Sequence, residues 1–187
     1  MPTQIKEQSN DRLFIITGGP GTGKTTLLDE LISRGTACVP EAARDIIQQE
    51  MRSGGDAVPW KNMQRYSELM LQKSIEDYLA YANARQVTIF DRGILDTFAH
   101  YRLAQLTLPE DSYEYAQLLR YNRNVFLTPP WEEIYETDSE RKQTYAEAVA
   151  VYQTIKDVYA KYGYNLIEIP KASVSERADF VMQALRS

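Results

Sequence analysis

The sequence predicts an α/β fold of three layers, in which helices cover both faces of a five-stranded parallel sheet. The 187 residues are enough for one domain with a substantial core, since 43% of them are hydrophobic. Short apolar runs alternate with longer segments of helical periodicity along the chain. The first apolar run, LFIIT at 13–17, is continuous, which is typical of a strand buried on both faces of a parallel sheet.

The expected elements follow one another as strand and then helix. Residues 1–11 are polar, and we expect them to form a flexible lead-in to a single domain over 12–187. The expected strands are 13–17, 36–39, 87–90, 124–128 and 165–169. The expected helices are 24–34, one opened by Pro40 and Glu41, 59–84, segments after Asp91 that break near Pro109, 143–162, and one from Ser173 or Ser175 to Leu185. Strands that alternate with helices in this way are joined by right-handed crossovers.

A glycine-rich segment follows the first expected strand. It reads GGPGTGKTT at 18–26 and fits G-x-x-x-x-G-K-[ST], with Gly18, Gly23, Lys24 and Thr25 in the fixed positions. Glycines let the backbone curl so that amide hydrogens point at phosphate oxygens, and the following helix N-terminus adds its dipole. Lys24 is expected to neutralise the β- and γ-phosphates, and the Thr25 hydroxyl to ligate magnesium. We therefore predict a site for ATP or GTP with Mg²⁺, contacted by Gly19, Pro20, Gly21, Thr22, Gly23, Lys24, Thr25 and Thr26.

Charged residues follow two other expected strands, at the edge where parallel sheets bind ligands. Asp91 is a candidate to hold magnesium through water, and the alternative is that it caps the next helix. Arg92 is placed to reach a substrate phosphate or hydroxyl, or else only pairs with Asp91 or Asp96. Glu41 is a candidate proton acceptor for an attacking hydroxyl, and the alternative is a first-turn glutamate that favours the helix dipole. Arg44, one turn later, is a weaker candidate for binding the acceptor.

The segment 129–142 is a long polar connection between the fourth strand and the next helix. In phosphotransferases this position holds a lid that brings arginines onto the transferring phosphoryl group. Arg141 is the candidate catalytic residue here, because its planar guanidinium matches phosphate oxygens. An ordinary surface loop is the alternative. Trp131 is interpreted as a residue that anchors this segment to the core.

Composition limits the partners and the location. The net charge of −5 gives no broad attraction for nucleic acid or an anionic membrane, so neither is expected as a partner. The N-terminus lacks the apolar core of a secretory signal, and no apolar run reaches the roughly 20 residues of a membrane span, so a cytoplasmic location is expected.

Helically spaced tyrosines and the face of Met63 and Met70 are candidates for a homodimer contact. His100, the single histidine, is expected to be structural.

Four segments together resemble a known family. They are GGPGTGKTT at 18–26, VPEAARDII at 39–47, FDRGILDT at 90–97 and ERK at 140–142. They are similar to a small P-loop AAA-type ATPase and kinase domain family, which includes the nicotinamide riboside kinase domains of NAD-regulator proteins. The VPE segment and the Asp–Arg pair also look like deoxynucleoside and thymidylate kinases.

The resemblance covers about residues 12–185. It implies a three-layer α/β/α P-loop NTPase fold of the nucleoside and nucleotide kinase type. It also implies a triphosphate site at 18–26, magnesium near Thr25 and Asp91, and a lid arginine at Arg141, although the lid reads DSER at 138–141 and matches only in part. The acceptor is not fixed by the resemblance.

Two functions fit these features. The leading prediction is a small ATP-dependent phosphotransferase of kinase type, with a nucleoside-like or other small hydroxyl acceptor bound between Glu41, Arg44 and Arg92. The alternative is an ATPase or GTPase regulatory switch that has no small-molecule acceptor and whose lid changes state on hydrolysis.

Overall fold

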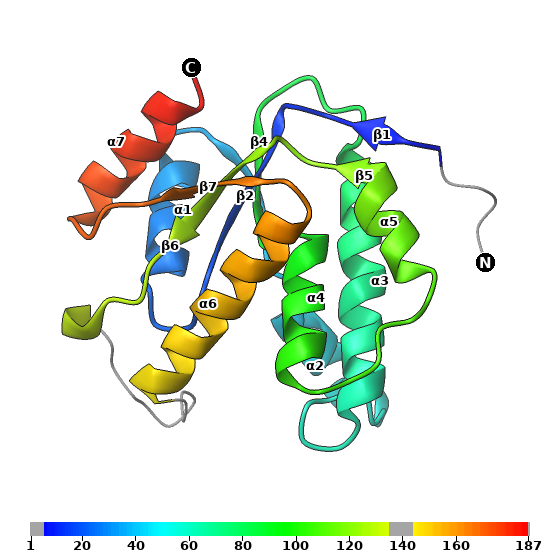
Figure 1. The fold of residues 1–187 in the computed structure, drawn as a ribbon. Coiled ribbons are helices and arrows are strands. Elements are labelled where there is room, and N and C mark those ends of the chain that lie inside the picture. The colour runs from blue at the N-terminus through cyan, green and yellow to red at the C-terminus, as the bar shows by residue number, and fades with distance from the viewer. Residues whose placement is uncertain (1–5, 135–143, 187) are drawn as a thin grey trace.

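The computed structural model describes residues 6–134 and 144–186. Within them, one sheet of five parallel strands lies between two layers of helices (Figure 1), which confirms the predicted fold class. The spatial order of the strands is β3-β4-β2-β6-β7. Their bounds are β2 Leu13–Gly18, β3 Ala37–Val39, β4 Thr88–Asp91, β6 Asn124–Thr128 and β7 Asn165–Glu168.

Strand β2 is central because its run of apolar residues suits burial on both faces, and all six of its residues are buried. Ile15 lies opposite Phe90 of β4 on one side and Val125 of β6 on the other. The chain builds β3 and β4 on one side of β2 and then crosses to build β6 and β7 on the other side. Ligands bind at such a reversal, outside the carboxyl ends of the strands.

Alternate residues of β2 serve two separate cores, as the pleat of a strand requires. Leu13 and Ile15 join the core beneath α3 (Met63–Tyr81), α4 (Ile94–Leu103) and α6 (Tyr145–Lys161). Phe14 and Ile16 join the core beneath α1 (Lys24–Ser33) and α7 (Val174–Ala184). Both helical layers are visible in Figure 1, with α1 and α7 together on one side of the sheet.

Side-chain caps set several helix starts. Asn62 accepts a hydrogen bond from the Arg65 amide, so α3 begins at Met63 rather than near Pro59. Ser173, one of two expected caps, accepts from the Glu176 amide and begins α7.

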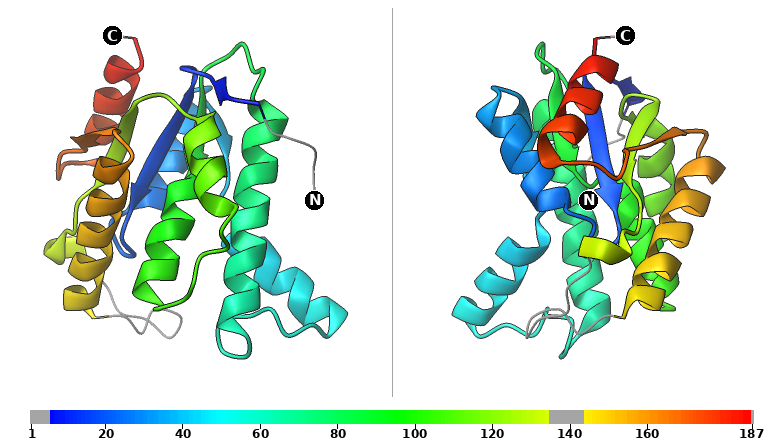
Figure 2. Two further views of the ribbon diagram at one scale, coloured as in Figure 1. Left: turned by 45° about the vertical axis from the view of Figure 1, so that its right-hand side comes forward. Right: turned by 90° about the vertical axis from the view of Figure 1, so that its left-hand side faces the viewer.

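Three further helical segments complete the description of the described residues. They are α2 (Ala43–Ser53), α5 (Ser112–Leu118) and the 3₁₀ turn η1 (Glu132–Ile134). Figure 2 shows α2 projecting from the body of the domain beside the N-terminal end of α3. No helix in the described ranges is long and apolar enough to cross a membrane.

A second, two-stranded pairing lies outside the main sheet. Strand β1 (Gln8–Ser9) runs parallel to β5 (Leu119–Arg120). The buried hydroxyl of Tyr78 lies 2.9 Å from the carbonyl oxygen of Gln8 and 3.0 Å from that of Arg120. Residues 8 and 9, part of the expected lead-in, are therefore held against the domain by backbone pairing and by Tyr78.

Candidate functional site

The glycine-rich segment forms a tight loop between β2 and α1. A Cβ atom on Gly18 would lie 1.9 Å from Oγ1 of Thr128, so only glycine fits there. Gly23 adopts a left-handed conformation with φ of 69°. In the described part of the chain no side chain caps the start of α1, which leaves its first amides available to an anion.

An open cleft of about 580 Å³ lies over this loop. Every residue predicted to contact the nucleotide, from Gly19 to Thr26, lines it. Glu41, Arg44 and Arg92 line its far wall, with Glu133 and Ile134. We call this space the phosphate cleft. Arg44 was expected to bind the acceptor, but its side chain lines the phosphate cleft.

Four of the predicted catalytic side chains meet in one cluster of charges. The Lys24 ammonium pairs with the Asp91 carboxylate, and its Nζ lies 3.7 Å from Oε2 of Glu41. The other oxygen of Glu41 accepts a hydrogen bond from Nε of Arg92 at 2.9 Å. Glu41 therefore bridges the loop lysine and Arg92, although the three residues come from separate parts of the chain.

Glu41 has this position because α2 begins later than expected. Pro40 and Glu41 precede the helix, which starts at Ala43. Glu41 lies in an irregular segment between β3 and α2, outside the first turn of the helix, and faces Lys24 and Arg92.

The two carboxylates of the cluster have opposite pKa shifts. Burial alone would raise the pKa of Glu41, but the charges of Arg92 and Lys24 outweigh it and lower that pKa. Burial raises the pKa of Asp91, and Lys24 offsets this only in part. Burial would lower the pKa of Arg92, but Glu41, Asp96 and Asp91 outweigh it and raise that pKa. Glu41 is therefore the carboxylate more firmly held in its ionised form.

Arg92 is held in a left-handed backbone conformation with φ of 73°, which is unfavourable for a residue with a Cβ atom. Its Nη1 donates to the Gly18 carbonyl at 3.0 Å and lies 3.4 Å from Oδ1 of Asp96. The guanidinium thus connects the phosphate loop, Glu41 and Asp96.

Asp96, rather than Asp91, caps the helix that follows β4. Its carboxylate accepts hydrogen bonds from the Gly93 amide at 2.8 Å and from the Tyr159 hydroxyl at 2.6 Å, and from the Thr17 hydroxyl. Asp96 is buried, and these donors satisfy it. Asp91 is left facing Lys24, so it does not take the capping role considered for it.

A second cleft of about 490 Å³ adjoins the first and shares Pro20, Glu41 and Arg92 with it. We call it the acceptor cleft. Its walls come from α3, α4 and α6 and are mainly apolar: Tyr66, Met70, Ala99, Leu103, Ala104, Ala150, Val151 and Ile155, with Asp96, His100 and Glu147. The periodicity of these helices predicts an apolar face, but it does not reveal that part of this face is open to a cleft.

His100 is a polar member of the acceptor cleft. Its Nε2 lies 3.0 Å from Oγ of Ser67, and its ring meets the Tyr66 ring edge to face. Burial, and then the charge of Arg92, lower the pKa of His100. The imidazole is therefore neutral near pH 7.

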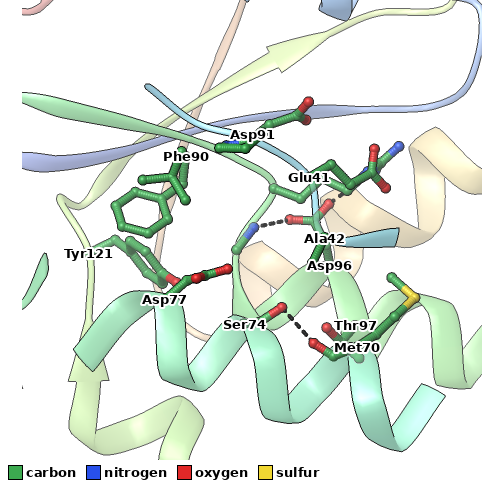
Figure 3. Close-up of a pocket in the computed structure, with 14 residues that line it drawn as sticks. Glu41, Ala42, Met70, Ser74, Asp77, Phe90, Asp91, Asp96, Thr97 and Tyr121 are labelled. Carbon is green, nitrogen blue, oxygen red and sulfur yellow. Dashed lines mark hydrogen bonds and ion pairs between the residues drawn. The ribbon is translucent and has the colours of Figure 1, made fainter. Parts of the chain in front are cut away.

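A smaller cavity of about 30 Å³ lies between the end of β3, the end of β4 and α3 (Figure 3). Glu41 and Asp91 line it, together with Asp77 and with Phe90 and Tyr121, whose rings meet edge to face. The Tyr121 hydroxyl is buried without a hydrogen-bond partner among the described residues. The space has room for about one water molecule, which the Tyr121 hydroxyl is able to bind.

The residues present fit a magnesium ion that arrives with a nucleotide. The Thr25 hydroxyl lines the phosphate cleft, and Asp91 lies behind Lys24. Magnesium typically takes one or two protein oxygens and completes its shell with phosphate oxygens and water. Among the described residues, no cluster of three or more acidic, histidine or cysteine side chains is able to hold a metal by itself. A bound magnesium ion would therefore need phosphate oxygens of the nucleotide to complete its set of ligands.

Part of the expected lid lies outside the described residues, and with it the candidate Arg141. The described start of this segment includes Trp131, which is half-buried, and η1. The guanidinium carbon of Arg177 lies 6.0 Å from the centre of the Trp131 ring. Sequence reasoning did not single out Arg177.

A glycine-rich loop between a central parallel strand and a helix, with charged residues at the neighbouring strand end, defines a P-loop domain of kinase-like architecture. A family model described as an AAA domain matches residues 13–177, and the chain belongs to this family. Nucleotide binding by the P-loop is implied by that membership. No curated protein matches the chain in sequence.

Solved structures of small-molecule kinases share the fold. Deoxyadenosine kinase from M. mycoides, with its products dCMP and dCDP bound, has a TM-score of 0.63 at 15% identity, covering 93% of this chain and 98% of that one. Thymidylate kinase from Ehrlichia chaffeensis has a TM-score of 0.58 at 16% identity, covering 95% and 99%. Shikimate kinase from Acinetobacter baumannii, in complex with shikimate, has a TM-score of 0.56 at 13% identity, covering 96% and 93%.

Proposed function

We propose that this protein is an ATP-dependent phosphotransferase whose acceptor is a small neutral or cationic molecule with a hydroxyl group, such as a nucleoside. The observation that carries the proposal is the junction of the two clefts. The phosphate cleft and the acceptor cleft meet at Glu41 and Arg92, so a hydroxyl bound in one faces a triphosphate bound in the other. A hydrolytic switch has no need of the second cleft.

The residues at this junction have separate roles in the proposed reaction. Loop amides and Lys24 hold the β- and γ-phosphates, and magnesium, when bound, neutralises developing charge on the phosphate oxygens. The acceptor oxygen forms a bond to the γ-phosphorus while the bond from that phosphorus to the bridging oxygen breaks, and ADP leaves. The hydroxyl proton passes to Glu41. The lowered pKa of Glu41 keeps its carboxylate ionised near neutral pH, which is the form that accepts a proton. Arg92 orients Glu41 and the hydroxyl through its fixed guanidinium.

Charge in the acceptor cleft favours a neutral or cationic acceptor. Of the described residues that line it, Arg92 is the one cation, and it already faces Glu41 and Asp96. His100 is neutral, and Glu147 adds a negative charge. A monophosphate or carboxylate acceptor would therefore find no unpaired cation among the described residues of this cleft and would meet three carboxylates, those of Glu41, Asp96 and Glu147.

The test is a panel of acceptors offered with Mg-ATP, with ADP release and phosphorylated product both measured. The panel includes the common nucleosides, nicotinamide riboside as a cationic nucleoside, nucleoside monophosphates and shikimate. We expect at least one neutral or cationic nucleoside to stimulate ADP release and to be phosphorylated, and the anionic acceptors to be slower. ADP release that no acceptor changes would contradict the proposal and favour the ATPase switch.

A further inference from the structure

Arg177 is a buried cation without a carboxylate. It lies in the first turn of α7, only 4% of its surface is exposed, and it forms no ion pair with any described residue. Its Nε is buried and lacks a hydrogen-bond partner among these residues, and burial lowers its pKa. Isolated buried charges are costly, so a side chain in this state calls for a compensating interaction.

The guanidinium contacts the phosphate loop from behind. Nη2 donates to the Thr22 carbonyl at 3.0 Å, and Nη1 lies 3.3 Å from the Gly23 carbonyl. A Cβ atom on Gly23 would lie 2.7 Å from Nη1, so glycine at this position is what lets the guanidinium approach. Trp131 covers it at the distance of a cation–π contact.

The contacts of Arg177 with the two carbonyl groups also fix the direction of the amide groups that follow them. In a trans peptide the carbonyl and the following amide hydrogen point in opposite directions. Anchoring the carbonyls of Thr22 and Gly23 on Arg177 therefore turns the amide hydrogens of Gly23 and Lys24 away from it. Gly23 and Lys24 line the phosphate cleft, so these are amides that a phosphate would meet.

We infer that Arg177 is a positioning residue for triphosphate binding, which holds two loop peptides with their amides toward the phosphates and whose positive charge is compensated when the anion binds. The role deepens the proposed function, since it rests on the same triphosphate site. It does not depend on any acceptor, and it concerns the phosphates and not the nucleobase.

The test compares Arg177→Met and Arg177→Lys with wild type in calorimetric titrations with Mg-ATP and with magnesium tripolyphosphate, which lacks a base and sugar. Arg177→Met is expected to weaken binding of both ligands by the same factor, on the order of 10-fold. Arg177→Lys keeps the positive charge but loses the planar guanidinium. Its affinities for both ligands are expected to lie between those of wild type and Arg177→Met. Nitrogen–proton NMR supplies a second readout, because the Gly23 and Lys24 amide signals should move on adding tripolyphosphate in wild type and much less in the variants.

Arg34→Met is the matched control. Arg34 also ties α1 to α7, through Asp179 at 2.6 Å and Ser175 at 2.8 Å, but does not contact the loop. It is expected to lower the melting temperature and leave both affinities unchanged. If Arg177→Met does not fold, Arg177→Lys and the NMR titration carry the test.

Three results would overturn the inference: unchanged affinities in the folded Arg177 variants, a loss confined to ATP, or an equal loss in Arg34→Met. The proposed function fails separately. If the Arg177 variants bind both ligands more weakly than wild type by the same factor, yet no acceptor is phosphorylated, the inference on Arg177 stands and the proposed phosphotransfer fails.

Discussion

The two clefts of this protein differ in how they are built. The phosphate cleft is formed largely by one continuous stretch, Gly19–Thr26, and glycine-rich loops of this kind bind phosphates largely through backbone amides. The acceptor cleft is assembled from side chains of three helices far apart in sequence, and most of them are apolar. Phosphate chemistry is the same for every nucleotide, so a backbone loop suffices. An acceptor is recognised by shape, which only side chains can supply.

The difference predicts that damage to one cleft will have a different kinetic signature from damage to the other. Loss on the phosphate side should affect nucleotide affinity and every reaction of the nucleotide. Loss on the acceptor side should spare nucleotide binding. Glu41 and Arg92 lie at the junction and test the separation most directly.

Lys24→Ala is expected to have the largest effect. It removes the ammonium that lines the phosphate cleft and leaves Asp91 buried without its main partner. ATP affinity and any turnover should both fall, the turnover by on the order of 100-fold or more. Calorimetry and ADP release measure the two effects, with the exposed Lys61→Ala as control. Unchanged ATP affinity in Lys24→Ala would falsify the triphosphate site itself.

Glu41→Gln should come next, with a loss of transfer of about 100-fold or more, as expected when a proton acceptor is removed. ATP affinity should change little, and Glu110→Gln, which changes an exposed glutamate outside both clefts, should behave as wild type. The pKa of Glu41 lies below its ordinary value of 4.5, so the acid limb of the transfer rate should also lie below pH 4.5. An acid limb near neutrality would show that another group accepts the proton.

Arg92→Lys is expected to have a smaller effect that is specific to the acceptor. Lysine keeps a positive charge but cannot contact Glu41, Asp96 and the Gly18 carbonyl from one planar group. The KM for the acceptor should rise by about 10-fold, with the KM for ATP within about 2-fold of wild type. An equal rise in both constants would mean that the two clefts are not separable at this residue.

Alkaline pH should produce the smallest effect, a loss of stability of the fold, and one of the tyrosines concerned, Tyr66, lines the acceptor cleft. Burial raises the pKa of Tyr66, Tyr78 and Tyr101 to about 12, above the ordinary value of 10. Because these pKa values are higher in the folded state, the protonated phenols contribute to the free energy of unfolding. The contribution is complete below pH 10 and is lost as the pH rises toward 12. Phenolate absorbance and circular dichroism should therefore change together in that window. In Tyr66→Phe, one fewer phenol should titrate between pH 10 and 12. Tripolyphosphate binding near pH 7 should be unaffected.

The fold was predictable because the signals for it are local and repeated. A continuous apolar run predicts the central strand, and the glycine motif predicts the loop and the start of α1. The capping of α4 was not decided by the sequence, in which Asp91 was considered both as a magnesium ligand and as the residue that caps this helix. The structure shows that Asp96 does so, since its buried carboxylate meets the Gly93 amide and the Tyr159 hydroxyl.

The site was predictable only where its residues follow strands. Glu41, Asp91 and Arg92 were predicted on this ground, and the structure brings them together in one cluster, although the position of Glu41 outside α2 was not predicted. Arg177 gave no signal, because an arginine in the first turn of an amphipathic C-terminal helix is expected to be exposed. Its burial against the loop depends on α7 packing beside α1, which is a tertiary contact without a sequence motif.

The left-handed backbone at Arg92 has a consequence for engineering. Two described residues other than glycine have positive φ, Arg92 at 73° and Gln105 at 55° just after α4. At Gln105 the conformation only ends a helix, so Gln105→Gly should stabilise the protein by about 1 kcal/mol without cost to activity. At Arg92 the same substitution would relieve the same strain but leave Glu41 and Asp96 without their guanidinium. A thermostabilisation campaign should therefore change Gln105 and keep Arg92.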